Sequence, residues 1–146
     1  MPFENPTPEE LRLFLGKLKT IAVVGMSLDP DRPSYSVAMY MQSRGCRIVP
    51  VRPGGGTILE EKVYSSLADI PFKIDLVDVF RASRFVSGHV DEAIAISAPA
   101  VWMQEGVIDE EAALRAKAAG LFVVMNRCLL KEYRKTRPPS GPGVKK

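Results

Sequence analysis

Three arginines occupy positions from which they could bind phosphate. Arg32, Arg52 and Arg81 each lie in a polar stretch that follows an apolar run rich in β-branched residues. A guanidinium binds phosphate through two parallel hydrogen bonds, which orients the anion as well as attracting it. If the apolar runs are parallel strands of one sheet, their carboxyl ends form the edge at which such sheets bind ligands. The three arginines therefore predict a site for a phosphate-bearing ligand; for any one of them alone, a solvated surface charge is the alternative.

The stretch 21–34 carries the clearest local signal for this site. The apolar run 21–24 ends at Gly25, a polar loop follows, and a helical pattern starts with Ser34 as its cap. A chain that turns at a glycine can approach an anion closely, and the amides at the start of the next helix point toward it. The loop lacks the full G-x-G-x-x-G fingerprint and carries Arg32 instead. It indicates a nucleotide-phosphate site that differs from an ordinary NAD site, with a tight strand end at Gly25 as the alternative.

The end of the second apolar run discriminates among nucleotides. An NAD site places Asp or Glu there to accept hydrogen bonds from the ribose hydroxyls. This chain has Arg52 and Pro53 instead, and an arginine suits a ribose that carries a phosphate, as in NADP or coenzyme A. Three glycines, 54–56, follow; they form either a flexible loop that folds over a ligand or a tolerated surface insertion.

Two residues near the end of the fourth apolar run complete the predicted ligand edge. Trp102 is favoured as a core residue because its large apolar ring is best buried. Gln104 has the stronger claim to a ligand, since a polar residue that leaves a buried strand at this edge requires a hydrogen-bond partner.

No catalytic set can be assembled from the sequence. The single histidine, His89, falls inside a predicted helix away from the ligand edge, so neither a Ser-His-Asp nor a Cys-His arrangement is available. Cys46 and Cys128 each lie beside a predicted strand and are expected to be buried free thiols, with a disulfide or redox role as the minority alternative. Two cysteines and one histidine make no plausible zinc site.

Alternating strand and helix patterns position these residues. Thr7, Pro8 and Glu10 form a capping box with proline at the first helical position, which predicts a helix at the N-terminus. Hydrophobic periodicity and glycine stops then predict strands 20–25, 46–51, 75–80, 100–103 and 121–125, helices 34–44, 84–97 and 109–120, and a short helix at 65–70. Pro50 is expected at the end of its strand. The repeat predicts a Rossmann-like three-layer α/β sandwich: a five-stranded parallel sheet in the order 3-2-1-4-5 with helices on both faces.

The charge of the chain is unevenly distributed. The net charge of the 146 residues is +3, but residues 131–146 hold six Lys/Arg and one acid, a net of +5, which leaves −2 for residues 1–130. The expected organisation is one domain, 1–133, and a flexible basic tail, 134–146, that aids solubility or touches an acidic partner. No apolar run could span a membrane and the N-terminus has no signal-peptide pattern, so a cytoplasmic location is expected.

Several short stretches, taken in their order along the chain, form a pattern that is specific for a protein family. They are 21–27 with 31–35, 49–53, 61–64 with 66–71, 75–81, 101–106 and 126–128. Together they resemble the small stand-alone CoA-binding proteins of the Rossmann type, a family similar to the N-terminal CoA-binding domain of the succinyl-CoA synthetase alpha subunit. The resemblance spans about residues 11–133 and implies coenzyme A or acyl-CoA as a small-molecule ligand. The phosphorylated histidine of the synthetase belongs to a further domain, so the resemblance does not imply a full ligase reaction.

The resemblance also implies roles for individual residues. Gly25, Ser27 and the segment from Arg32 to Ser34 would hold the pyrophosphate; Arg52 and Pro53 would meet the ribose and its 3′-phosphate, with Lys62 nearby; Val79, Phe80 and Arg81 would border the adenine; Trp102 and Gln104 would line the pantetheine side. The chain departs from the family at Arg52, where asparagine is usual, and at the inserted glycines 54–56. The ribose end of the site is therefore where it differs most from the family.

The sequence thus predicts a small cytoplasmic protein that binds CoA or acyl-CoA and has no evident catalytic residues of its own. One alternative is an NADP-dependent oxidoreductase, which Arg52 keeps open, and another is a CoA-using enzyme subunit that lacks its partner. A third is a regulatory protein whose basic tail contacts nucleic acid or another chain. No membrane and no specific nucleic acid are expected as partners, whereas a protein partner or a homo-oligomer stays open.

Overall fold

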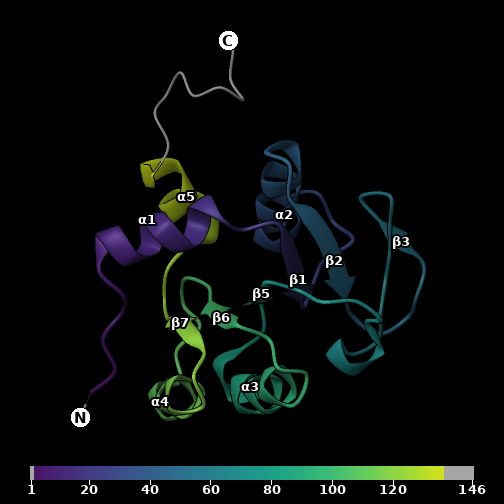
Figure 1. Cartoon of the computed structure of the whole chain (residues 1–146). Helices are drawn as coiled ribbons and strands as arrows, with labels where there is room; N and C mark the ends of the chain where they lie inside the picture. The colour runs from purple at the N-terminus through teal and green to yellow at the C-terminus, as the bar shows by residue number, and fades with distance from the viewer. Residues whose placement is uncertain (1, 137–146) are drawn as a thin grey trace.

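Five parallel strands form one sheet, and helices cover both of its faces (Figure 1). In the computed structural model, which describes residues 2–136, the strands lie in the order β2-β1-β5-β6-β7 and each neighbouring pair is parallel. The strands of this sheet are β1 (Thr20–Val24), β2 (Arg47–Val51), β5 (Leu76–Val79), β6 (Ala100–Met103) and β7 (Phe122–Val124). The remaining elements are α1 (Pro8–Gly16), α2 (Pro33–Ser43), α3 (Val86–Ala95), α4 (Glu110–Ala118), α5 (Leu129–Thr136), the hairpin strands β3 (Thr57–Ile58) and β4 (Glu61–Lys62), and the 3-10 turns η1 (Leu67–Asp69) and η2 (Ser83–Phe85).

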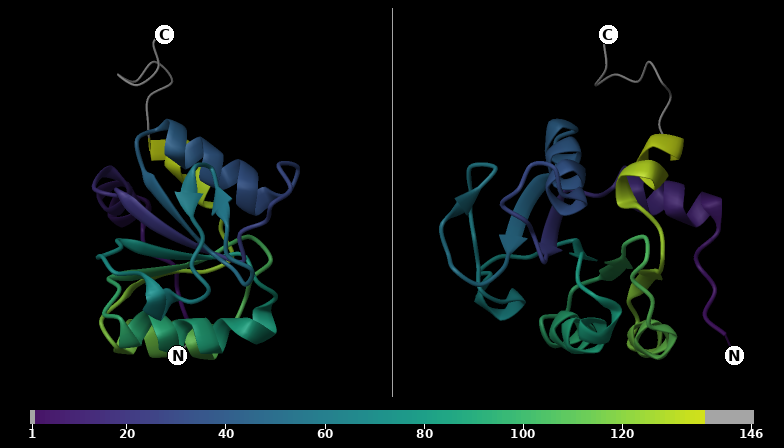
Figure 2. Two further views of the ribbon diagram at one scale, coloured as in Figure 1. Left: turned by 90° about the vertical axis from the view of Figure 1, so that its right-hand side faces the viewer. Right: turned by 180° about the vertical axis from the view of Figure 1, so that it is seen from behind.

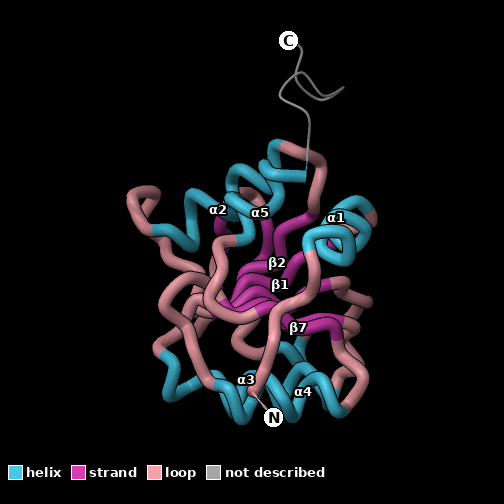
Figure 3. The backbone as a smooth tube through the Cα atoms, turned by 90° about the vertical axis from the view of Figure 1, so that its left-hand side faces the viewer, coloured by secondary structure: helices cyan, strands magenta, loops and turns pink. Residues whose placement is uncertain are grey.

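The sheet is the middle of three layers, as predicted. Helices α1, α2 and α5 cover one face and α3 and α4 cover the other (Figures 2 and 3). Successive strand residues point to opposite layers, so that Ile21 and Val23 belong to the first apolar core and Ala22 and Val24 to the second. Both faces of the strands are buried, which is why they appear in the sequence as continuous apolar runs. The three-layer α/β class is confirmed.

The predicted strand order is wrong. In place of 3-2-1-4-5, the third predicted strand, β5, pairs with β1 and not with β2, which gives the order 2-1-3-4-5. The outer edge of β2 is occupied by the segment that follows β4: the N–H of Tyr64 donates to the carbonyl of Pro50 and the N–H of Arg52 donates to that of Tyr64. The free edge for β5 is therefore on the other side of β1. This places the switch point of the sheet between β1 and β5.

Pro50 lies within β2 and not at its end. Its carbonyl accepts from Tyr64 on the outer side of the sheet, whereas the carbonyl of Val51 accepts from the N–H of Gly25 on the inner side. Because N–H and C=O of one strand residue point to the same side, the proline nitrogen faces outward. A proline on an edge strand in this orientation removes no hydrogen bond from the ladder.

Two predicted helix starts have different outcomes. The capping box of α1 is confirmed: Thr7 Oγ1 accepts from the N–H of Glu10, and Glu10 Oε1 accepts from the N–H of Thr7. Ser34 is not the cap of α2, because the helix begins at Pro33, whose fixed φ suits the first helical position. The Ser34 hydroxyl instead accepts the N–H of Ser27 and ties the preceding loop to the helix.

The sequence did not predict α5 or the β3–β4 hairpin. Helix α5 runs to Thr136, across the position at which the sequence places the end of the domain, and the rest of the predicted tail lies outside the described residues. The helix packs against α1 and α2 through Leu129 and Tyr133. Within residues 2–136, no helix is long and apolar enough to cross a membrane.

Candidate functional site

A cleft of about 600 Å³ opens at the carboxyl ends of β1, β2, β5 and β6. It lies over the switch point between β1 and β5, where open parallel sheets bind their ligands. The residues that line it come from the loops after these strands, the first turns of α2 and the segment before α5: Gly25, Met26, Ser27, Arg32, Pro33, Ser34, Val37, Arg52, Phe80, Arg81, Ala82, Gln104, Glu105, Gly106, Val107 and Cys128.

Gly25 brings the end of β1 close to the end of β5. Its φ of +84° lies in the left-handed region that favours glycine. A Cβ at this position would lie 2.6 Å from the carbonyl oxygen of Phe80 and 2.8 Å from Cδ of Arg81, closer than any side chain tolerates. Only glycine therefore lets the loop after β1 start against the backbone of β5.

The loop between Gly25 and α2 is held by its own polar side chains. The N–H of Ser27 donates to Ser34 Oγ (2.9 Å), and Ser27 Oγ accepts from the N–H of Asp29 (2.9 Å). Asp29 Oδ1 in turn accepts from the N–H of Asp31 (2.9 Å), so the Asp29 side chain stabilises the turn. The loop thus presents the start of α2, the positive end of the helix dipole, to the cleft.

The three arginines that the sequence singled out all line this cleft. Arg52 Nη1 donates to the carbonyl of Met26 (3.1 Å), and the Arg81 guanidinium lies 4.2 Å from the ring centroid of Phe85. None of the three forms an ion pair with a described residue. The acid in the cleft lining, Glu105, is bound by Lys131 (3.0 Å). The cleft therefore combines three guanidiniums with one already neutralised carboxylate.

The β6 end of the cleft has a different character. Gln104 is only 5% exposed, and its Oε1 accepts the N–H of Leu129 (3.2 Å). The amide nitrogen of Gln104 has no hydrogen-bond partner among residues 2–136. Among these residues it is not one of the fully buried polar atoms, so it is accessible from the cleft that Gln104 lines. Apolar Val37 and Val107 and the thiol of Cys128 lie around it. This end suits a neutral ligand segment that carries hydrogen-bonding carbonyl groups.

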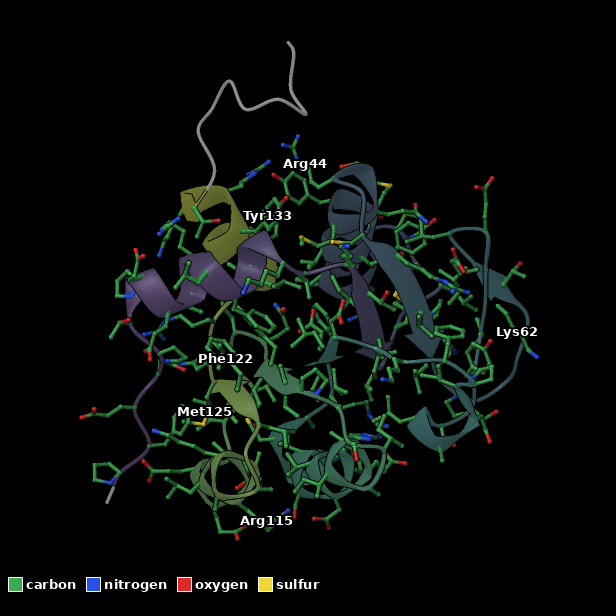
Figure 4. The ribbon with its side chains drawn as sticks, viewed as in Figure 1. Arg44, Lys62, Arg115, Phe122, Met125 and Tyr133 are labelled. Carbon is green, nitrogen blue, oxygen red and sulfur yellow. The ribbon has the colours of Figure 1, made fainter. Side chains whose placement is uncertain are left out.

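Eight of the residues predicted as ligand contacts line the cleft, and four do not. The eight are Gly25, Ser27, Arg32, Ser34, Arg52, Phe80, Arg81 and Gln104. Val79 and Trp102 are fully buried in the sheet, and the indole N–H of Trp102 donates to the carbonyl of Arg127 (2.9 Å). Pro53 is exposed outside the cleft, and Lys62 lies on the hairpin beyond β2 with its Nζ 5.2 Å from the ring centroid of Tyr64 (Figure 4).

The cleft also contains residues to which the sequence assigned no ligand role. Val37 and Val107 had no signal beyond being apolar, and Cys128 was predicted only as a buried thiol. Both cysteines are buried and in no disulfide, as predicted. Cys128 nevertheless borders the cleft because the loop after β7 crosses the end of β6, where the N–H of Arg127 donates to the carbonyl of Met103.

Other titratable groups offer no cluster beside the cleft. His89 Nδ1 lies 2.8 Å from Glu92 Oε1 within α3, outside the cleft lining. No group of three His, Cys, Asp or Glu residues within residues 2–136 could hold a metal ion. Asp78, two residues before Phe80, is fully buried in β5, and neither carboxyl oxygen has a partner among the described residues. Burial raises the pKa of Asp78 well above its ordinary value, because an ionised carboxylate is poorly solvated inside the sheet.

The sequence of residues 19–134 matches the family described as the CoA binding domain. The chain belongs to this family. The family resemblance predicted from the short motifs is therefore confirmed, and the cleft over the switch point is the place where a member of such a sheet family would hold its ligand.

Relatives of this CoA binding domain are both small proteins and a part of a much larger enzyme. The uncharacterized protein YneT of Bacillus subtilis (strain 168) is 40% identical over 126 residues, which cover 86% of this chain and 93% of that protein. A solved structure of a protein from Pyrococcus horikoshii OT3 is 36% identical, has a TM-score of 0.87 and is matched over 93% of this chain and 96% of its own. Acetate–CoA ligase (ADP-forming) II of Archaeoglobus fulgidus is 30% identical over 86 residues, 58% of this chain but 12% of the ligase.

Proposed function

We propose that this protein binds coenzyme A or an acyl-CoA in the cleft at the carboxyl ends of β1, β2, β5 and β6. The observation that carries the proposal is the set of three guanidiniums, Arg32, Arg52 and Arg81, that line one cleft without a carboxylate partner among the described residues. Clustered positive charge of this kind is stable only when it faces solvent or an anion. A ligand with several phosphates, such as CoA, satisfies it.

The two ends of the cleft match the two halves of CoA. CoA joins a 3′-phosphorylated ADP to a neutral arm that contains two amides and ends in a thiol. Gly25, Ser27 and the start of α2 with Arg32 suit the pyrophosphate, Arg52 suits the 3′-phosphate, and Phe80 with Arg81 offers a surface on which adenine can stack. The arm then extends past Gln104, whose free amide N–H groups can donate to an amide carbonyl of the arm.

NADP is the second candidate ligand, and Arg52 is the residue that favours it. An arginine at the end of the second strand accommodates a 2′-phosphate as well as a 3′-phosphate. An unphosphorylated NAD is disfavoured because Arg52 follows the last residue of β2, the position at which an acid would bind the ribose hydroxyls. The family membership favours CoA over NADP. The chain then acts as a CoA carrier or sensor, or as a separate subunit of a CoA-using enzyme, the latter in line with the domain within the ligase of Archaeoglobus fulgidus.

Replacing Arg32 by alanine is expected to weaken CoA binding by about 1–3 kcal/mol, because charge-assisted hydrogen bonds to phosphate are lost. Arg32 is exposed, and its side chain forms no ion pair or helix-capping hydrogen bond with any of residues 2–136, so the substitution should leave the fold intact. The measurement is isothermal titration calorimetry with CoA on the purified protein. Arg44→Ala is the matched control, since Arg44 ends the same helix at its far end (Figure 4). Equal affinities for folded Arg32→Ala and wild type would remove Arg32 from the site.

A further inference from the structure

Cys128 lies at the end of the cleft that is remote from Arg52. The residue precedes α5, and its carbonyl accepts the N–H of Glu132 in the first turn of that helix. The loop that carries it is fixed across the end of β6 by two hydrogen bonds: the N–H of Arg127 donates to the carbonyl of Met103, and the indole N–H of Trp102 donates to the carbonyl of Arg127. Strand spacing puts the end of β6 about 14 Å from the end of β2. The thiol therefore sits where the pantetheine arm would extend from phosphates held at the arginines.

A second observation marks this end as a place for a ligand. Gln104 is 95% buried, since its exposed fraction is 5%, and its amide nitrogen has no partner within residues 2–136. Its Oε1 is bound by the N–H of Leu129, the residue next to Cys128, which fixes the side chain and turns the amide N–H groups to the cleft. A buried donor of this kind is satisfied by a ligand carbonyl, and the arm of CoA carries two.

We propose that Cys128 captures CoA as a mixed disulfide by exchange with an oxidised, disulfide form of CoA. This inference rests on the proposed function, because it needs the phosphate half of CoA to be held at the arginines. The Cys128 thiolate attacks one sulfur of the CoA disulfide, the S–S bond of that molecule breaks, and a new S–S bond joins Cys128 to one CoA. The other CoA leaves as a thiolate and takes up a proton. One thiol and one disulfide enter and one of each leaves, so no further oxidant is required.

The surroundings of Cys128 favour this exchange over a purely structural role. Cys128 is 9% exposed and borders the cleft, so a bound sulfur can reach it. Binding of the phosphates holds the reacting sulfur beside the thiol and raises its effective concentration.

Cys46 supplies the internal comparison. It is 6% exposed, slightly more buried than Cys128, and its Sγ contacts the carbonyl of Leu18 (3.6 Å) in the core below α1 and α2. It does not line the cleft. If burial alone set thiol reactivity, the two cysteines would react alike; if the cleft directs the reaction, only Cys128 will carry CoA.

The test is intact-mass spectrometry of the wild-type protein after incubation with CoA disulfide, followed by peptide mapping. The expected result is one CoA per chain, located on Cys128, retained in Cys46→Ser, absent from Cys128→Ser and removed by dithiothreitol. Adenosine 3′,5′-bisphosphate, which competes for the phosphate site, should slow the reaction. The small disulfide cystamine, which lacks phosphates, should react at least about tenfold more slowly than CoA disulfide.

Two results would overturn the inference: no adduct on the wild type, or an adduct that forms as fast with cystamine as with CoA disulfide. Peptide mapping of the wild type keeps the test valid even if Cys128→Ser fails to fold. Calorimetry with reduced CoA on the wild type separates this inference from the proposed function. Reversible CoA binding without an adduct contradicts only the role of Cys128, whereas absent CoA binding contradicts the proposed function itself.

Discussion

Replacing Asp78 by asparagine is expected to remove a loss of stability that the wild-type protein suffers as the pH rises. Asp78 is fully buried without a partner among the described residues, and burial raises the pKa of its carboxyl well above the ordinary value. In the unfolded chain the same carboxyl ionises near its ordinary pKa of about 4. Between these two pKa values the folded state holds one proton more than the unfolded state. The free energy of unfolding therefore falls by about 1.4 kcal/mol for each pH unit in that window.

The sign of this pH dependence follows from the raised pKa. The contribution of protonated Asp78 to the free energy of unfolding is fully present below the pKa of the unfolded chain. It is lost as the pH rises through the pKa of the folded protein. Asparagine has nearly the same shape and cannot ionise, so the difference in unfolding free energy, variant minus wild type, should grow from about pH 4 upward by about 1.4 kcal/mol per unit. Urea unfolding at a series of pH values measures it.

Asp69→Asn provides the reference for Asp78→Asn. Asp69 is exposed in η1, so its substitution makes the same chemical change outside the core. A difference between Asp78→Asn and wild type that stays constant with pH would mean that Asp78 ionises in the folded protein. It would then have a solvent or ligand contact that its burial in β5 does not indicate.

Gly25→Ala is expected to lower the free energy of unfolding by about 2–4 kcal/mol, the sum of left-handed backbone strain and overpacking. The new Cβ would lie 2.6 Å from the carbonyl oxygen of Phe80, a backbone atom that cannot move without disturbing β5. CoA binding should be lost as well, because the loop after β1 and the carboxyl end of β5 form one wall of the cleft. Urea unfolding and calorimetry with CoA measure the two effects.

The Gly45→Ala variant separates the cost of backbone strain from the cost of the close Cβ contact. Gly45 has a φ of +99°, close to that of Gly25, but a Cβ there would meet no atom within 4 Å. The substitution should cost only about 1 kcal/mol, the strain alone. Equal losses of stability for Gly25→Ala and Gly45→Ala would show that the contact between the new Cβ at position 25 and Phe80 adds no destabilisation. That result would contradict the close packing described for the cleft.

Local signals in the sequence were sufficient for most elements but not for their arrangement. The capping box at Thr7 predicted the start of α1 because its side chains satisfy free backbone N–H groups. The helix predicted from residue 109 begins at Glu110, where the side chain of Asp109 accepts the N–H of Ala112. The strand order depends on which edge of β2 is free. That is decided by backbone hydrogen bonds of Tyr64, which leave no pattern of residue types.

The β3–β4 hairpin shows why some elements left no signal. Its turn residues, Leu59 and Glu60, have φ values of +53° and +66°, a conformation normally occupied by Asn-Gly or Asp-Gly. Neither residue predicts a turn. The hairpin is stable because Ile58 and Val63 are buried against the core shared with α2, a tertiary contact that overrides the local preference.

The candidate site was predicted at its polar residues and at Phe80, and was missed at Val37, Val107 and Cys128. Arginine, glycine and glutamine at strand ends are unusual enough to mark a site, so Arg32, Arg52, Arg81, Gly25 and Gln104 were found. Val37, Val107 and Cys128 are ordinary core residues by type, and only the packing of the loop after β7 across β6 shows that they face the cleft. Trp102 is fully buried, as its residue type favoured, and does not line the cleft as the family resemblance implied.

Side-by-side calorimetry of CoA, acetyl-CoA, NADP and NAD at one salt concentration tests the central claim most directly. A common salt concentration is needed because binding to three guanidiniums weakens as salt rises. The arginine-lined cleft with an amide-binding, apolar end predicts that CoA and acetyl-CoA bind while NAD does not. Binding of NADP with no binding of CoA would contradict the assignment and make the cleft a dinucleotide site; binding of none of the four would show that the cleft holds no nucleotide of this class.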